Sequence, residues 1–343
     1  MTDQKRRFGI GVVGAGMGAK PHALALQSLH DTVEVRGVFR RNGAERDAFC
    51  AQYGFPPASG IDALLDDPLV DALLILTPPN ARDDLVLAAA KAGKHVLCEK
   101  PLERTLAAAE RIVATADTAG ITLGVIFQHR FRQASLYLAQ AVAEGRYGRL
   151  DAVHLVVPWW RPQSYYDQPG RGSWAQDGGG VLITQAIHSL DLMLSLCGPV
   201  AAVTAMSKTT RLHQMETEDF VSAGLEFANG AVGAVMATTA GFPGGPESLA
   251  LHFEHASATL TAGDLVVHLR NGQTLTEGEA GQGGGGADPM AFPFDWHRAQ
   301  IADFVHAVRH GRQPLSNGHS ALVVHRLIDA LFRSAQEGRR VAV

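Results

Sequence analysis

The chain has 343 residues, of which 46% are hydrophobic and 19% charged, enough for about two domains with buried cores rather than a disordered chain. Thirty basic and 34 acidic residues give a net charge of −4 without a basic cluster, which argues against a nucleic-acid partner. Three cysteines without paired spacing favour a reducing, cytoplasmic location, and the sequence contains neither a signal-peptide pattern nor an apolar run of membrane-spanning length.

In the first third of the chain, short β-rich runs alternate with alanine- and leucine-rich stretches, as in the βαβ units of a parallel sheet. We expect a helix over 81–92, with Asn80 as its N-cap and Gly93 as its stop, and a second helix over 106–119 that ends at Gly120. The predicted strands are 8–13, 33–39, 72–76, 94–98 and 122–126. Residues 1–126 are therefore predicted to form a Rossmann dinucleotide-binding domain.

The first predicted strand runs into GAGMGA at 14–19, which matches G-x-G-x-x-G/A with alanine last. Gly14 permits a tight turn, Gly16 lets backbone N–H groups approach a pyrophosphate, and Ala19 allows close helix–strand packing. The pattern predicts that Gly14, Gly16, Met17 and Gly18 bind a dinucleotide. A glycine-rich turn without a ligand is the alternative.

The end of the second strand indicates which dinucleotide binds. Residues 38–42 read VFRRN, and the only nearby acid, Glu34, falls at the opposite end of the strand. An acid after this strand would bind the ribose 2′-hydroxyl of NAD, whereas guanidinium groups bind phosphate through charge-assisted bonds. Arg40 and Arg41 therefore favour NADP over NAD, unless both are solvated loop residues.

Lys100 follows the predicted strand 94–98 within Glu99-Lys100-Pro101. It thus lies at the carboxyl end of a parallel strand, where ligands of open α/β sheets bind. Oxidation of an alcohol requires a proton acceptor, and a cationic nicotinamide beside a lysine would lower the lysine pKa below about 10.4. Lys100 is the candidate acceptor, with Glu99 to orient or partly neutralise it. A surface lysine in a turn that ends at proline is the alternative.

After about residue 150, strands dominate the pattern. Asn229-Gly230 and Asn271-Gly272 are hairpin turns, and helices are predicted over 181–197, 297–309 and 320–336. The predicted strands are 151–157, 201–207, 220–227, 231–238, 249–255 and 265–269, and the glycine-rich tract 278–287 is expected to be a mobile loop. Residues 127–343 are therefore predicted to form an α+β domain with a large, mostly antiparallel open sheet, which serves substrate binding and oligomerisation.

The glycine turn with His22, segment 72–78 and AGKHVLCEKP at 92–101 together resemble the glucose-fructose oxidoreductase and inositol dehydrogenase (Gfo/Idh/MocA) family. Further matches at 130–131, 178–180, 188–191 and 300–304 extend the resemblance over nearly the whole chain. It implies Lys100 and His188 as the catalytic pair, and homodimers or homotetramers built through the open sheet face. By the same resemblance, cofactor-binding residues also include Thr77, Pro78, Asn80, Glu99, Lys100 and Gln128.

Within the predicted helix 181–197, Thr184, His188 and Asp191 are four and three residues apart, so their side chains share one face. Gln185 flanks His188, and Asp191 is a candidate to hold the orientation of its ring. Many family members carry aspartate in place of Thr184, and because threonine cannot act as a base at neutral pH, Lys100 is the stronger catalytic candidate.

A second departure from the family pattern is Arg82, where histidine is common. Metal binding is also considered for His188 and Asp191. Because no further histidine or carboxylate has a spacing that completes a site with them, we expect no metal.

Aromatic and arginine residues alternate in WWRPQSYY at 159–166 and RGSW at 171–174. Such segments suit a polyhydroxylated or anionic ligand, and a loop packed on its own aromatic rings is the alternative. The predicted substrate-binding residues are Lys100, Arg130, Arg161, Tyr165, Trp174, Thr184, Gln185 and His188.

The sequence thus predicts an NAD(P)-dependent oxidoreductase that transfers a hydride between nicotinamide and a secondary alcohol or ketone of a sugar, cyclitol or sugar derivative. Two alternatives stay open: NAD-dependent glycoside hydrolysis through transient oxidation, and regulatory cofactor binding without turnover. The presence of Lys100 and His188 argues against the second.

Overall fold

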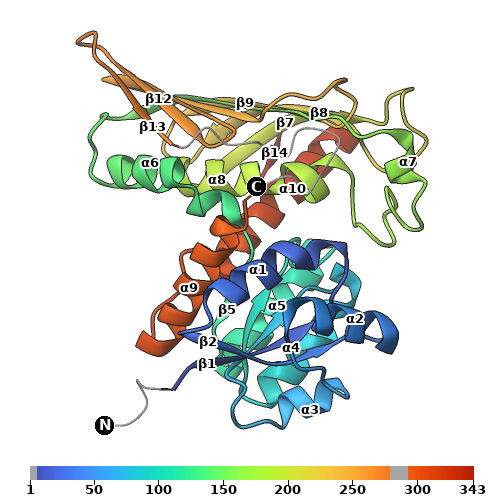
Figure 1. The fold of residues 1–343 in the computed structure, drawn as a ribbon. Coiled ribbons are helices and arrows are strands. Elements are labelled where there is room, and N and C mark those ends of the chain that lie inside the picture. Colours follow the sequence, from blue (N-terminus) through green and yellow to red (C-terminus); the bar gives the residue numbers. More distant parts are fainter. Residues whose placement is uncertain (1–5, 279–292) are drawn as a thin grey trace. The chain divides into compact units, whose positions relative to one another are not determined.

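A computed structural model describes residues 6–278 and 293–343, so most of the predicted loop 278–287 lies outside the described residues. The chain divides into two compact units (Figure 1). The first unit comprises the described residues up to Glu103, Ala107–Ile126 and Pro293–Ala321. The second unit comprises Arg104–Leu106, the described residues 127–278 and Leu322–Val343. None of the described helices is long and apolar enough to cross a membrane.

The first unit contains a five-stranded parallel sheet of order β2-β1-β3-β4-β5. All five predicted strands are present, three of them one or two residues shorter than predicted. The strands are β1 (Phe8–Val13), β2 (Val33–Phe39), β3 (Ala72–Ile75), β4 (His95–Cys98) and β5 (Leu123–Val125). The helices are η1 (Met17–Ala19), α1 (Lys20–Ser28), α2 (Gly43–Tyr53), α3 (Ile61–Leu65), η2 (Pro79–Ala81), α4 (Arg82–Lys91), α5 (Leu106–Ala119) and α9 (Asp295–His310), and α10 (Gly318–Glu337) begins in this unit.

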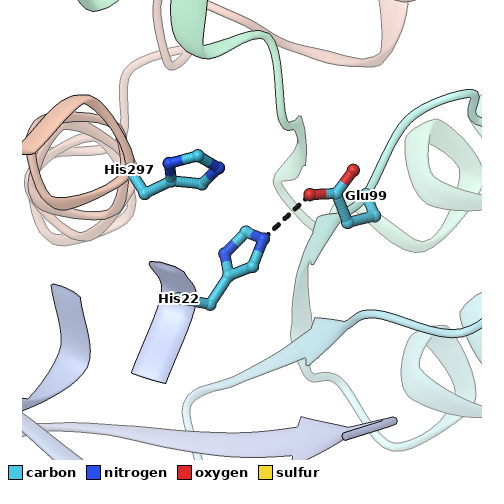
Figure 2. A group of neighbouring side chains, drawn as sticks. All are labelled: His22, Glu99 and His297. Carbon is cyan, nitrogen blue, oxygen red and sulfur yellow. Dashed lines mark hydrogen bonds and ion pairs between the residues drawn. The ribbon is translucent and has the colours of Figure 1, made fainter. Parts of the chain in front are cut away.

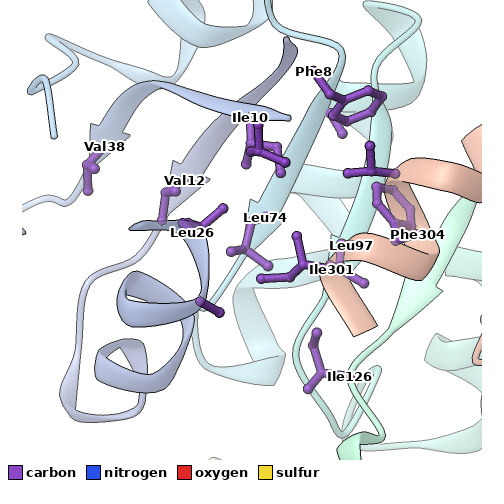
Figure 3. Packing of buried hydrophobic residues seen from close by; sticks show 14 of the residues in the cluster. Phe8, Ile10, Val12, Leu26, Val38, Leu74, Leu97, Ile126, Ile301 and Phe304 are labelled. Atoms are coloured by element: carbon purple, nitrogen blue, oxygen red, sulfur yellow. The ribbon is translucent and has the colours of Figure 1, made fainter. Parts of the chain in front are cut away.

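The core of the first unit forms between β1, its neighbouring strands and α9 (Figure 3). Strand β1 is buried along its whole length, as expected where helices cover both faces of a parallel sheet. Phe304 of α9 is 1% exposed, and its ring lies edge-on to Phe8 at 6.5 Å. A Cβ at Gly124 of β5 would lie 2.8 Å from the Phe304 ring, so glycine makes room for this contact.

The place of α9 differs from the predicted division at residues 126 and 127. The boundary between Ile126 and Phe127 is present, but the segment Pro293–Ala321 returns to the first unit. The reason is the apolar stripe of α9: Ile301 and Phe304 are buried in the cluster that contains Ile10 and Leu97. A helix with this stripe gains more by covering the parallel sheet than by remaining in solvent.

The second unit contains a nine-stranded sheet of order β13-β12-β11-β10-β6-β9-β8-β7-β14, in which only the β6–β9 pair is parallel. The predicted α/β chain with a mostly antiparallel second sheet is confirmed. The strands are β6 (Leu150–Pro158), β7 (Val200–Lys208), β8 (Phe220–Phe227), β9 (Val232–Thr238), β10 (Ser248–Phe253), β11 (Ala256–Thr261), β12 (Asp264–Leu269), β13 (Thr274–Glu277) and β14 (Val341–Ala342).

Helices lie along one face of this sheet (Figure 1). Those seen along this face are α6 (Gln133–Ala143), α8 (Ile187–Cys197) and the second part of α10. The unit also contains η3 (Gln128–Phe131), α7 (Gln163–Tyr166) and the π-helical segment η4 (Leu182–Ala186). Burial alternates along the strands, as in β11, so the opposite face carries the half-exposed set of side chains. That face is partly apolar, with Met206 and Val232 more than half exposed.

Candidate active site

The glycine turn joins β1 to η1 and α1. Gly14 has φ +98°, donates its N–H to the Phe39 carbonyl at 2.9 Å, and would carry a Cβ 3.0 Å from the backbone of Leu76, so only glycine fits without strain. A Cβ at Gly16 or Gly18 would meet no atom of the described chain within 4 Å. The backbone at Gly16 and Gly18 is therefore open to a ligand at a helix N-terminus, as the pyrophosphate of a dinucleotide requires.

Arg40 lies beside this turn, because its Nη1 donates to the Ala15 carbonyl at 2.5 Å. Its Nη2 also forms an ion pair with Glu45 of α2, and Arg41 is exposed. The prediction that Glu34 is the only nearby acid is wrong, because the first turn of α2 brings Glu45 back toward the strand end. The helix begins there because Asn42 caps it by accepting the Glu45 N–H. Arg40 is thus close to the glycine turn but partly neutralised.

The segment after β3 carries Thr77, Pro78 and Asn80. The Oγ1 of Thr77 is buried and has no hydrogen-bond partner within the described ranges, as expected of a group that awaits a ligand. The predicted capping role of Asn80 is wrong. Pro79–Ala81 forms a 3-10 turn, so α4 begins at Arg82, and its N-cap Ala81 makes no side-chain bond.

Lys100 follows β4, and hydrogen bonds hold its backbone. The Oε2 of Glu99 accepts the Lys100 N–H at 2.9 Å, and the Oε1 lies 2.8 Å from the Nε2 of His22 (Figure 2). Burial by itself raises the pKa of the Glu99 carboxyl, but the His22 hydrogen bond and the positive charges nearby lower it to about 2. Glu99 is therefore an anion that fixes the Lys100 peptide through its side chain.

His297 of α9 completes a cluster with His22 and Glu99 in which both histidines are buried and Glu99 is half-buried (Figure 2). Burial and the adjacent His22 lower the pKa of His297 to about 3, so its ring is neutral. The three ligand-type atoms lie within 4.8 Å of one another. Two ligands of a tetrahedral zinc ion, with bonds of about 2.1 Å, would be about 3.4 Å apart. Because His22 and Glu99 approach to 2.8 Å, the pair suits a shared proton better than a metal. Sequence spacing gave no signal for this cluster, since its members lie far apart in the chain.

His188 of the second unit lies in the first turn of α8 and is 7% exposed. Its ring packs edge-on to Phe127 at 6.0 Å and tilted against His129 at 5.1 Å. The preceding residues form a π-helical turn, which the predicted continuous helix did not include. Because a π turn is wider than an α turn, the expected alignment of Thr184 above His188 does not follow from spacing alone.

Thr184 donates its hydroxyl to the Gly180 carbonyl at 2.5 Å and contacts the side chain of Gln185, which is buried. Asp191 does not hold the His188 ring as expected. Its two carboxylate oxygens instead accept Nε and Nη2 of Arg130, each at 2.6 Å. This planar, bidentate pair suits a guanidinium better than an imidazole.

Gln128 lies at the start of η3 and is buried, and its Oε1 has no hydrogen-bond partner in the described part of the chain. This oxygen is a second buried polar atom that a ligand would satisfy. The assignment of Gln128 to the cofactor, which the family resemblance implies, stays a prediction.

Glu218, which the sequence analysis missed, holds the start of the helix that carries His188. Its carboxylate accepts the Gly180 N–H at 2.9 Å and the Leu182 N–H at 3.1 Å. Burial raises the pKa of Glu218 to about 7. A Cβ at Gly180 would lie 1.7 Å from the Glu218 carbonyl oxygen, which explains the glycine there.

The aromatic segment packs largely on itself. Arg161 is 3% exposed, its guanidinium lies over the rings of Trp159 at 5.4 Å and Tyr165 at 5.9 Å, and its Nη1 donates to the Trp160 carbonyl. Trp174 is 48% exposed. The contacts of Arg161 and Tyr165 match the packing alternative, and the role of all three in substrate binding stays a prediction.

Each unit thus gathers part of the predicted site. The first unit brings the glycine turn, Arg40, Thr77 and Lys100 to the carboxyl edge of its sheet. The second holds Gln128, Arg130, Thr184, Gln185 and His188 on η3, η4 and α8. The proposed catalytic partners Lys100 and His188 belong to different units.

Comparisons with known proteins match both units. The GFO_IDH_MocA model, described as an oxidoreductase family with an NAD-binding Rossmann fold, matches residues 8–127, and the GFO/IDH/MocA C-terminal domain matches residues 135–259. The chain is 27% identical over 346 residues to D-xylose 1-dehydrogenase (NADP(+)) 2 of Haloferax volcanii, covering 96% of this chain and 98% of that protein.

Two further similarities cover different lengths. 1,5-Anhydro-D-fructose reductase of Ensifer adhaerens is 35% identical over 203 residues, which cover 58% of this chain and 60% of that protein. The crystal structure of the WlbA dehydrogenase from Bordetella pertussis in complex with NADH and UDP-GlcNAcA is 30% identical, with a TM-score of 0.82, and the match covers 98% of this chain and 99% of that one.

Proposed function

Because the chain belongs to the Gfo/Idh/MocA family of oxidoreductases, we propose that it transfers a hydride between a nicotinamide dinucleotide and a secondary alcohol or ketone of a sugar, cyclitol or sugar derivative. The observation that carries the proposal is the carboxyl edge of the parallel sheet, where the glycine turn follows β1 and Lys100 follows β4, with β3 between these two strands. The substrate class is supported by the dehydrogenases and reductases that the chain resembles over both units.

The residues divide the chemistry as follows. A bound nicotinamide supplies the acceptor or donor of the hydride. Lys100 accepts the hydroxyl proton of the alcohol at Nζ during oxidation and returns it during reduction. His188 hydrogen-bonds the substrate oxygen or relays the proton, and Gln128 and Thr77 satisfy their buried polar atoms on the cofactor.

NADP is the proposed cofactor, with NAD as the alternative. Arg40 supports NADP because it stands at the glycine turn, where a 2′-phosphate would find a guanidinium. Glu45 reduces this preference because it already pairs with Arg40.

The proposal includes a homodimer or homotetramer built through the open face of the second sheet. The partly apolar side chains of that face, such as Met206 and Val232, support it. A cytoplasmic location is also proposed, supported by free thiols at Cys50, Cys98 and Cys197.

Titration calorimetry with NADP(H) and NAD(H) tests the proposal, after absorbance and mass spectrometry have determined whether a cofactor co-purifies. We expect exchangeable, micromolar binding of NADP, followed by turnover in a screen of sugars and cyclitols. Tightly retained NAD without net turnover would instead favour the glycosidase or regulatory alternative, and binding of neither dinucleotide would contradict the proposal.

Replacement of Lys100 tests the proton acceptor. Lys100→Ala is expected to reduce kcat by about 10²-fold or more while cofactor affinity changes little, because only the acid–base group is lost. Lys91→Ala, at an exposed lysine in the last turn of α4, is the matched control. Near-normal turnover of the Lys100 variant would refute its role.

A further inference from the structure

Arg82 is buried, with 3% exposure, although it opens α4 with a charged side chain. Its guanidinium bonds only to peptide carbonyls among the described residues. Nε and Nη2 donate to the Thr77 carbonyl at 3.0 and 2.7 Å, and Nη1 donates to the carbonyls of Glu99 and Pro101. A single side chain thus ties the end of β3 to the end of β4.

Two of the three carbonyls that Arg82 holds, those of Glu99 and Pro101, flank Lys100 on both sides. From the other direction the Glu99 carboxylate accepts the Lys100 N–H, and His22 holds that carboxylate (Figure 2). The backbone on each side of Lys100 is therefore fixed by a buried cation, and its N–H by a half-buried anion. The long side chain of Lys100 extends from this fixed backbone.

The chemistry of arginine suits this task. Three carbonyls on two separate segments need a planar group with several donors at fixed angles, which a guanidinium provides and a lysine ammonium does not. Burial of a cation without a carboxylate partner among the described residues has an energetic cost, and the four hydrogen bonds to three carbonyls offset part of it. A buried guanidinium beside Lys100 therefore indicates that Arg82 does more than fill space.

We propose that Arg82 is a positioning residue for Lys100: it fixes the backbone from which Lys100 extends, and so the place of the amine at the carboxyl edge of the sheet. This inference rests on the proposed role of Lys100 as proton acceptor. Misplacement of a reacting group by about 1 Å can reduce a rate 10²-fold, so loss of the four hydrogen bonds of Arg82 should affect kcat more than cofactor binding.

A double-mutant cycle of Arg82→Met with Lys100→Ala tests the coupling. We expect Arg82→Met to reduce kcat by about 10- to 100-fold with KM and cofactor Kd within a few-fold, and to have no further effect on kcat when Lys100 is already alanine. An equal loss in both backgrounds, or unchanged kcat, would overturn the proposal. Arg82→Lys, which keeps the charge with fewer donors, is expected to fold where methionine fails and to recover part of the rate.

Lys94→Met is the matched control. Lys94 also donates to two carbonyls, those of Asp67 at 2.8 Å and Val70 at 2.9 Å. It precedes β4, however, and so lies at the opposite edge of the same sheet from Lys100. Lys94→Met should lower the free energy of unfolding without altering the part of kcat that depends on Lys100.

A measurement without substrate separates this proposal from the proposed function. The chain has only six lysines, so ¹³C-methylated amines can be resolved by NMR and the Lys100 signal assigned by its loss in Lys100→Ala. Arg82→Met is expected to change the chemical shift of the Lys100 signal and the pH at which that signal titrates, whereas Lys94→Met is expected to change neither. An unmoved Lys100 signal would refute positioning by Arg82 even in an active enzyme, whereas a shifted signal in a protein without dinucleotide binding would refute the enzyme function alone.

Discussion

Arg40 contacts both a peptide carbonyl of the glycine turn and a carboxylate of α2. Its position agrees with the strand-end argument made from sequence. Its pairing with Glu45 does not follow from that argument, because the acid arrives from the next helix. The choice between NADP and NAD therefore depends on how strongly Glu45 competes with a 2′-phosphate for one guanidinium.

Cofactor preference should respond to this competition. Glu45→Gln is expected to raise the ratio of NADP to NAD affinity by about 10-fold, because a charge-assisted bond is worth about 1.5–3 kcal/mol. Arg40→Asp combined with Arg41→Ala should reverse the preference. Calorimetric Kd values for both dinucleotides measure it, with Arg46→Ala, at an arginine of α2, as the control. An unchanged ratio in all variants would show that neither arginine reads the phosphate.

At the scale of elements, the helix that carries His188 has an irregular start. The sequence predicts one helix over 181–197, and the structure divides it into η4 and α8. Glu218 supplies the acceptor for the first N–H groups, so the helix start depends on a carboxylate from the segment before β8. Such a contact between distant segments cannot be read from a helical period.

Glu218 should make the stability of the second unit depend on pH. Its folded-state pKa of about 7 exceeds the ordinary value of 4.5, so the folded protein holds the proton more tightly than the unfolded chain. This contribution, about 3 kcal/mol, is fully present below pH 4.5 and is lost as pH rises through 7. Glu218→Gln should abolish this part of the decrease in the free energy of unfolding between pH 5 and 8, which denaturant unfolding measures.

The matched control is Glu226→Gln, which removes an exposed carboxylate from β8. It should leave the slope of stability between pH 5 and 8 unchanged. A Glu218→Gln variant with the slope of the parent protein would show that Glu218 has an ordinary pKa.

At the scale of the whole molecule, each unit has its own sheet, and the chain passes between the units more than once. Helix α9, far along the sequence, supplies Phe304 and Ile301 to the core of the first unit. The stability of the cofactor-binding unit therefore depends on residues outside the first 126. Truncation of the chain after residue 126 would expose this apolar surface of the sheet.

Phe304→Ala tests this dependence. Loss of a fully buried phenylalanine should reduce the free energy of unfolding of the first unit by about 3–5 kcal/mol. Leu87→Ala, at a side chain 41% exposed on α4, should cost much less. Calorimetry with and without saturating dinucleotide identifies the unfolding transition of the first unit, because the ligand raises the Tm of that transition and not of the other. A shift confined to the other transition would contradict the assignment of α9.

Local pattern by itself determined the five strands of the first sheet, six of the nine strands of the second sheet, the glycine turn and the place of Lys100 at a strand end, because alternation, turn residues and motif spacing are properties of neighbours in the chain. It missed the strands β11, β13 and β14. Only the tertiary structure decided the unit to which α9 belongs, the Arg130–Asp191 pair and the bonds around Lys100. These depend on which buried surfaces and charges meet across long separations in sequence, where the gain from burial and pairing outweighs local preference.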